Sequence, residues 1–165
     1  MRKQIRSRLR STIVSLAIAI PIAFSISFVF PTYVVATESM TPTIPAGSYV
    51  ITIRASLLPE SVRKDDIVVF QPVEGISSYP WIHRLIAEAG EHYSPVARKG
   101  RMDVSLDGTA VKNDGATDPL LVPDDFFYQS GDSATSFHGL VPKRLVTGKV
   151  IVHFKLPWTQ RRGLR

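Results

Sequence analysis

The chain of 165 residues contains no cysteine, which excludes disulfide bonds, a cysteine nucleophile and a thiolate metal site. It also has no glycine-rich phosphate loop, and its four histidines lack the spacing of metal ligands. These histidines are His83, His92, His138 and His153. We therefore expect no metal and no cofactor.

Charge is distributed unevenly along the chain. The net charge is +6 and the sequence pI is about 9.8. No acidic residue occurs in the first ten positions, and the closing segment is also basic, whereas the middle mixes both signs. A nucleic-acid surface would need a basic stripe, so we expect no nucleic-acid partner. The length suits one domain with a modest core.

The stretch from Ser11 to Thr37 carries no charge over 27 residues. As a helix it would cover about 40 Å, more than the ~30 Å hydrocarbon core of a bilayer. We predict a cytoplasmic basic segment at 1–10, a transmembrane anchor at 11–36 and an exported domain at 37–165. Pro21 should kink the helix, and Pro31 should end it or begin its exit from the membrane.

A cleaved signal peptide would also combine a basic start with an apolar run. This run exceeds the usual apolar region of about 7–15 residues, and the passable cleavage site near Ala36 borders the motif described below. An uncleaved single-pass anchor in the cytoplasmic (inner) membrane is therefore favoured. The positive-inside rule keeps the arginine-rich start in the cytoplasm and the domain on the outer, periplasmic face.

We predict that the exported part is mainly β. Short runs rich in β-branched and aromatic residues, separated by Pro and Gly, predict its strands. The predicted strands are 48–53, 66–70, 81–86, 103–106, 109–111, 126–128 and 149–154, with a hairpin turn at Asp107-Gly108. Single helical turns are predicted near 59–63 and 142–145. The expected architecture is one anchor helix followed by a compact coiled sheet or small barrel.

A serine in a proline-rich loop follows the anchor directly. Ser39 lies in Thr37-Glu-Ser-Met-Thr-Pro-Thr-Ile-Pro-Ala-Gly47. Alone, such a serine is ordinarily only a loop residue. The string Ser-Met-x-Pro-Thr, then Pro-x-Gly, then a strand, resembles the nucleophile segment of type I signal peptidases. The segment 64–70 is similar to a scaffold strand of that family.

A third segment, Trp81-Ile-His-Arg-Leu-Ile-Ala-Glu-Ala-Gly-Glu91, resembles the family segment that carries the general base. Bacterial members have a lysine where this chain has His83. The pair His83-Arg84 is similar to the archaeal and endoplasmic-reticulum branch, which uses serine and histidine. An ordinary core or surface histidine is the alternative for an isolated His on a strand.

A fourth segment contains Gly131-Asp132, Gly139-Leu-Val and Gly148-Lys149, which resemble the closing motifs of the family. The loop between them departs from the family, because the usual Ser-x-Asp-Ser-Arg is shortened to Ser136-Phe-His138. Which residue supports the base is therefore open. His138 is expected to have an ordinary loop role.

The resemblance implies a serine endopeptidase with Ser39 as nucleophile and His83 as base. Histidine suits this role because its reference pKa is about 6.5, but its tautomer needs a partner, usually a carboxylate. Asp132 is the first candidate for that partner, and a turn-capping role is its alternative. The Ser39 N–H and the Thr37 hydroxyl would stabilise the oxyanion.

The family cleaves precursor proteins with N-terminal signal sequences after an Ala-x-Ala pattern, with the substrate extended along an edge strand. Met40 and Ile44 are expected to line the substrate groove or contact the membrane. Three other readings remain: a maturation peptidase for a pilin or conjugative-transfer protein, an inactive family member acting as an assembly factor, and a soluble self-cleaving repressor-type peptidase. The membrane segment argues against the last.

Overall fold

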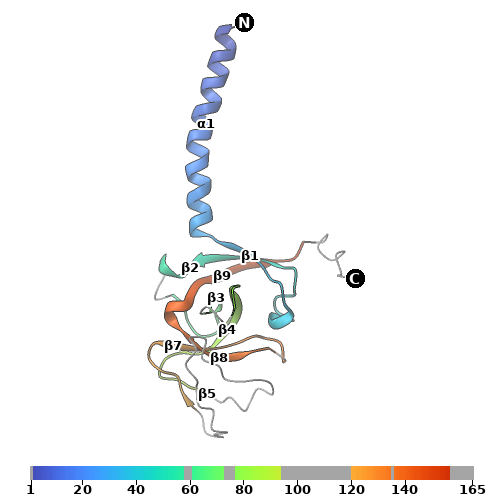
Figure 1. Ribbon diagram of the computed structural model, residues 1–165, viewed down its shortest axis with the longest axis vertical. Helices are drawn as coiled ribbons and strands as arrows, with labels where there is room; N and C mark the ends of the chain where they lie inside the picture. The colour runs from blue at the N-terminus through green and yellow to red at the C-terminus, as the bar shows by residue number, and fades with distance from the viewer. Residues whose placement is uncertain (1, 58–60, 73–76, 94–119, 135, 157–165) are drawn as a thin grey trace.

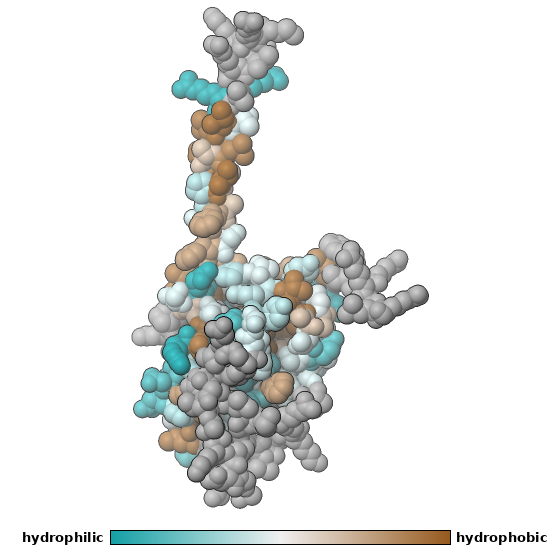
Figure 2. Space-filling view, in the orientation of Figure 1, coloured by the Kyte–Doolittle hydropathy of each residue, from teal (hydrophilic) through white to brown (hydrophobic). Residues whose placement is uncertain are grey.

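A computed structural model describes residues 2–57, 61–72, 77–93, 120–134 and 136–156 of the chain. Its first element is helix α1 (Arg2–Val29), which includes Pro21 and projects away from the β-sheet (Figure 1). The segment Arg10–Val29 is long and apolar enough to cross a membrane, and none of it is buried in the protein. Figure 2 shows this segment as a largely apolar column above a more polar domain.

The helical part of the predicted anchor ends before Pro31, and residues 32–34 within the predicted 11–36 span form a strand instead. Two side chains of strand β2 (Tyr49–Arg54) bind the end of α1 and the segment between α1 and β1 (Thr32–Val34). The Arg54 Nε donates to the Phe28 carbonyl at 2.9 Å, and the guanidinium lies 4.4 Å from the centre of the Phe28 ring. Thr52 donates to the Pro31 carbonyl through both its hydroxyl and its N–H, each at 2.9 Å. The helix end is therefore attached directly to the sheet.

The domain is built on one antiparallel sheet of seven strands in the order β1-β2-β9-β3-β4-β7-β8. These strands are β1 (Thr32–Val34), β2 (Tyr49–Arg54), β3 (Ile67–Phe70), β4 (Trp81–Ala87), β7 (Phe126–Ser130), β8 (His138–Pro142) and β9 (Val146–Phe154). β5 (His92–Tyr93) and β6 (Leu120–Leu121) pair separately. The mainly β prediction after one apolar helix is confirmed.

Five of the predicted strands match β2, β3, β4, β7 and β9 to within a few residues. The short strands β1, β5, β6 and β8 were not predicted. β1 lies inside the apolar anchor run, where alternation carries no signal, and β8 contains glycine and proline. The predicted hairpin at 103–111 lies outside the described residues. Of the two predicted helical turns, the one near 142–145 corresponds to the 3₁₀ turn η4 (Lys143–Leu145). The one near 59–63 lies partly outside the described residues, and its described part, 61–63, is not helical. A 3₁₀ turn that was not predicted, η2, occupies Ala55–Leu57.

Three buried clusters form the core around this sheet. The largest joins β3, β4, β7, β8 and β9 through Phe70, Leu85, Phe127, Val141 and Val146, among others. A second joins β5 to β4, β7 and β8 through Tyr93, Ala87, Tyr128 and Leu140. The third packs the loop after β1 against β2. Burial of apolar area is the main driving force for such packing, at about 25 cal/mol per Å². The third cluster matters for function because it holds the loop that carries Ser39.

Candidate active site

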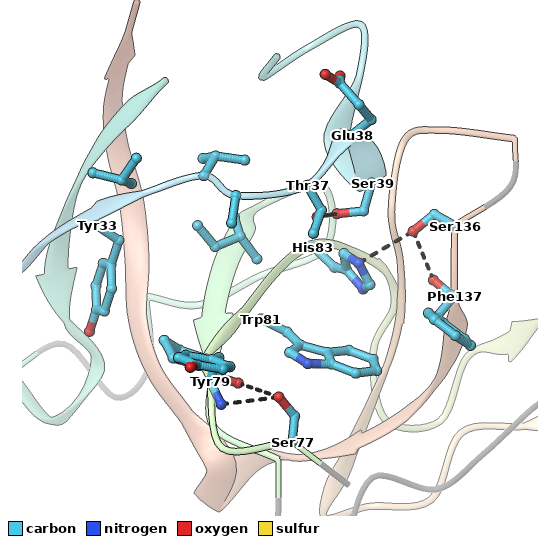
Figure 3. Close-up of a pocket in the computed structure, with 15 residues that line it drawn as sticks. Tyr33, Thr37, Glu38, Ser39, Ser77, Tyr79, Trp81, His83, Ser136 and Phe137 are labelled. Carbon is cyan, nitrogen blue, oxygen red and sulfur yellow. Dashed lines mark hydrogen bonds between the residues drawn. The ribbon is translucent and has the colours of Figure 1, made fainter. Parts of the chain in front are cut away.

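A groove of about 680 Å³ runs along the domain beside β1. One wall is the chain from Tyr33 to Ser39, and the other comes from the start of β4 and the loop before β8 (Figure 3). The lining residues are Tyr33, Val34, Val35, Ala36, Thr37, Glu38, Ser39, Ser77, Tyr79, Pro80, Trp81, Ile82, His83, Ser136 and Phe137. The side chains of Thr37, Ser39, His83 and Ser136 lie together at one end of the groove (Figure 3).

Ser39 lies on a single 3₁₀ turn, η1 (Glu38–Met40), directly after the extended residue Thr37. The turn is anchored by Met40, whose side chain is fully buried and whose carbonyl accepts from the Ile44 N–H at 2.8 Å. Ser39 itself is half-buried at the groove. The Thr37 hydroxyl donates to the Ser39 Oγ at 3.2 Å. The two hydroxyls predicted for attack and oxyanion binding therefore lie side by side.

The loop after β7 holds the Ser39 backbone in place. The Ser133 N–H donates to the Ser39 carbonyl at 3.0 Å. Gly131 permits this close approach, because a Cβ at that position would lie 2.4 Å from the Ser39 carbonyl oxygen and 1.9 Å from the Ser136 Oγ. Real Cβ atoms essentially never come within 3.0 Å of another heavy atom. The glycine of the Gly131-Asp132 motif is thus required by packing at the site.

His83 faces the interior of the sheet from β4, where burial alternates along the strand. Its side chain is only 3% exposed, and both ring nitrogens have a partner. Nδ1 is hydrogen-bonded to the Gln129 Oε1 on β7, and Nε2 lies 3.3 Å from the Ser136 Oγ. No hydrogen bond joins the Ser39 Oγ to His83 in the described part of the chain. Such contacts are often long before substrate binds.

Burial lowers the pKa of His83 to about 4, although the hydrogen bond that its Nδ1–H donates to Gln129 and the charge of Asp132 both act to raise it. The physical cause is the cost of placing an imidazolium away from water. The imidazole is therefore neutral at neutral pH. A neutral ring has one nitrogen free to accept a proton, as a general base requires.

Aromatic rings pack against His83, with Trp81 on the groove side and the fully buried Phe70 in the core. The Trp81 ring lies 5.7 Å from the His83 ring and 5.5 Å from the Phe137 ring, and the Phe70 ring lies 5.9 Å from His83. These spacings are typical of favourable aromatic pairs. Together the rings help to keep water from the imidazole, which is 3% exposed.

Asp132, the residue expected to orient His83, is paired with Arg84. The Asp132 carboxylate receives the Nε and one terminal nitrogen of Arg84 at 2.9 and 2.7 Å. Arg84 follows His83 directly on β4, and adjacent residues of a strand point to opposite faces. Asp132 therefore binds the residue next to His83, and the His83 Nδ1 is bonded to Gln129 instead.

Met40 and Ile44 are also placed differently from the expectation. Both are fully buried and pack with Val35 and Val50 in the third core cluster, and neither lines the groove. Their burial gives them a packing role in this cluster, at the turn that carries Ser39. His138, expected in a loop, is a buried residue of β8 whose Nδ1 is bonded to the Tyr128 hydroxyl.

Two polar residues at the site were missed from the sequence, Gln129 and Ser136. Gln129 was visible as the one amide in the run Phe126-Phe-Tyr-Gln-Ser130, where a core-facing polar side chain needs a buried partner. Ser136 was noted only as part of a shortened loop. Among the described residues, no cluster of three His, Cys, Asp or Glu could hold a metal ion. The arrangement fits acid–base and nucleophilic chemistry.

Comparison with known proteins agrees with this chemistry. The sequence model of the family described as "Signal peptidase, peptidase S26" matches residues 7–118, a range that includes Ser39 and His83. A protein named "Signal peptidase I" from Leptolyngbya laminosa is 27% identical over 144 aligned positions. That alignment covers 78% of this chain and 70% of the relative.

Proposed function

The chain belongs to the signal peptidase family, peptidase S26, and we propose that it is a membrane-anchored endopeptidase that cleaves signal peptides from exported precursors with Ser39 as nucleophile and His83 as base. One observation carries the proposal. A partly exposed serine and a buried, neutral histidine line the same end of one groove. Because the chain belongs to this family, it is a serine peptidase. The geometry of the groove supports Ser39 as the nucleophile and His83 as the base.

In the first step, the Ser39 Oγ attacks the scissile carbonyl carbon while its proton passes to the His83 Nε2. When the tetrahedral intermediate collapses, the imidazolium returns this proton to the leaving amine and the C–N bond breaks. Water then hydrolyses the ester on Ser39 with His83 again as base. In the resting chain the Nε2 is bonded to the Ser136 hydroxyl, which can turn to the Phe137 carbonyl, 3.4 Å away, when Nε2 carries a proton.

The developing oxyanion would be bound by the Ser39 N–H and the Thr37 hydroxyl. The N–H belongs to the first turn of η1, where a helix offers no carbonyl partner. The Thr37 hydroxyl is already within 3.2 Å of the Ser39 Oγ. Donors positioned before the charge forms are worth about 3–4 kcal/mol each in such sites.

The substrate would lie extended in the groove. β1 is an edge strand of the sheet, and Val34 on it is 58% exposed. An edge strand offers unpaired N–H and C=O groups to a second extended chain. Apolar α1 would hold this edge close to the bilayer, with its basic start in the cytoplasm and the domain outside the inner membrane.

The test is cleavage of a panel of presecretory and pilin precursors by the purified full chain in detergent. Ser39→Ala and His83→Ala should each abolish cleavage and leave the fold unchanged by circular dichroism. Ser56→Ala and His92→Ala are the matched controls, because both residues are exposed and neither lines the groove. The controls should cleave like the wild type.

The outcomes separate the alternatives. Cleavage of many precursors indicates general signal peptide processing, and cleavage of one pilin or conjugative-transfer precursor indicates a specialised maturation peptidase. Cleavage by His83→Ala would mean that another group is the base. A folded wild type that cuts no precursor would support a non-catalytic assembly role and overturn the proposal.

A further inference from the structure

A buried amide is the partner of the base. Gln129 is 1% exposed and His83 is 3% exposed, so both polar groups are removed from water and depend on each other. Their contact follows from the register of the sheet. Gln129 lies opposite Leu85, which is on the same face of β4 as His83, so Gln129 is the diagonal neighbour of the histidine. Long side chains reach across such a diagonal.

The contact determines the tautomer of the imidazole. A glutamine Oε1 can only accept a hydrogen bond, so the Nδ1 bonded to it must carry the proton. In the neutral ring the Nε2 then has the free lone pair. This nitrogen faces the Ser136 hydroxyl at the groove, where Ser39 also lies.

We propose that Gln129 is the positioning residue of this active site, so that Ser39, His83 and Gln129 form a triad with a neutral amide in place of a carboxylate. This rests on the proposed function above for the roles of Ser39 and His83. The amide fixes the ring plane and presents Nε2 to the nucleophile without a buried negative charge. A carboxylate in the same dry position would need desolvation.

No other group described around His83 is placed to bind its Nδ1 as Gln129 does. The neighbouring strand β3 contributes Val68 and Phe70, and the loop before β8 contributes Ser136, all uncharged. The nearest charges are Asp132 and Arg84, which are paired with each other. Glu38 on η1 also lines the groove, but its side chain is exposed.

Three variants of the full chain in detergent test the triad. Gln129→Glu supplies an acceptor with a charge, Gln129→Met keeps the length and removes the acceptor, and Gln71→Glu makes the same charge change outside the groove as the control. Two readouts are used. One is the pH dependence of kcat/KM for precursor cleavage, and the other is the ¹⁵N NMR shift of the His83 ring, which reports tautomer and protonation without catalysis.

For Gln129→Glu we expect the acidic limb of kcat/KM and the NMR titration of His83 to move up by one pH unit or more, because a nearby opposite charge favours the imidazolium. For Gln129→Met we expect kcat to fall about 10²-fold or more with KM changed less than about threefold, and the ring to lose its pure Nδ1–H tautomer. Gln71→Glu should change neither.

If the wild type cleaves but both Gln129 variants keep its pH profile, kcat and tautomer, Gln129 only fills space and the inference is wrong. If Gln129→Met misfolds, the ¹⁵N shifts of the His83 ring in the wild type decide, since a ring with its proton on Nε2 would contradict an imidazole held through Nδ1 by Gln129. If the wild type cleaves nothing, the proposed function fails, and the NMR titration still decides whether Gln129 sets the state of His83.

Discussion

Gly131→Ala is the most demanding test of the site geometry. The added Cβ would lie 1.9 Å from the Ser136 Oγ, 2.6 Å from the Ser136 Cβ and 2.4 Å from the Ser39 carbonyl oxygen. The serine hydroxyl could rotate away, but its Cβ and the Ser39 backbone cannot. To restore the 3.0 Å that real contacts keep, the Ser39 carbonyl must move by about 0.6 Å and the hydroxyl by about 1.1 Å.

These movements predict a large effect on rate and a smaller one on stability. The shift would strain the Ser133 N–H contact to Ser39 and displace the group that holds the His83 Nε2. Misplacement of catalytic groups by about 1 Å costs about 10²-fold in rate. Overpacking of this kind lowers the free energy of unfolding by about 1–3 kcal/mol.

The assay is kcat with a saturating precursor peptide in detergent, beside thermal unfolding of the same preparations. Gly90→Ala is the control. Gly90 has φ +79° and nothing within 4 Å of an added Cβ, so its substitution strains the backbone by about 1 kcal/mol without touching the groove. A folded Gly131→Ala chain with more than about a third of wild-type kcat would refute the close packing of Ser39, Gly131 and Ser136.

Three further predictions concern His83 and the charges near it. Because burial lowers the pKa of His83 to about 4, the imidazole should stay neutral, and kcat/KM should not fall through its protonation, until the pH approaches 4. A fall of kcat/KM centred near pH 6.5 would contradict the buried imidazole. The unfolded chain takes up the proton near pH 6.5 and the folded chain only near pH 4, so the free energy of unfolding should fall by about 3 kcal/mol between pH 7 and pH 4. His83→Ala should flatten that part of the denaturation curve against pH. Asp132→Asn removes the ionic partner of Arg84 and should lower the free energy of unfolding by about 1–2 kcal/mol in urea titrations. Its activity should stay within about tenfold, whereas loss of a carboxylate that oriented the base would cost on the order of 10⁴-fold.

Most of the architecture could be predicted from local patterns in the sequence. A charge-free run of 27 residues is long enough for a membrane helix whatever follows it, and alternation identified β2, β3, β4, β7 and β9 because burial of one face has a period of two. The nucleophile and base segments were recognisable because each is a short contiguous string. The roles of Ser39 and His83 within those strings stay predictions.

The contacts between strands were beyond the reach of local pattern. Gln129 and His83 are 46 residues apart, and their meeting depends on the register of β4 with β7, which shifts at an irregularity between Leu85 and Ala87. A slip of one residue would have turned the amide to the other face. The same register brings the Asp132 carboxylate into contact with the Arg84 guanidinium.

The sequence by itself determined that this chain has an apolar helix, a β-rich domain and the signal peptidase family's serine and histidine segments, because those properties are local or contiguous. Only the tertiary structure decided that an amide rather than a carboxylate is hydrogen-bonded to the histidine Nδ1, that Met40 and Ile44 are core, and that Gly131 must be glycine. Each of these depends on which atoms of distant segments meet, and that is set by sheet register and packing together.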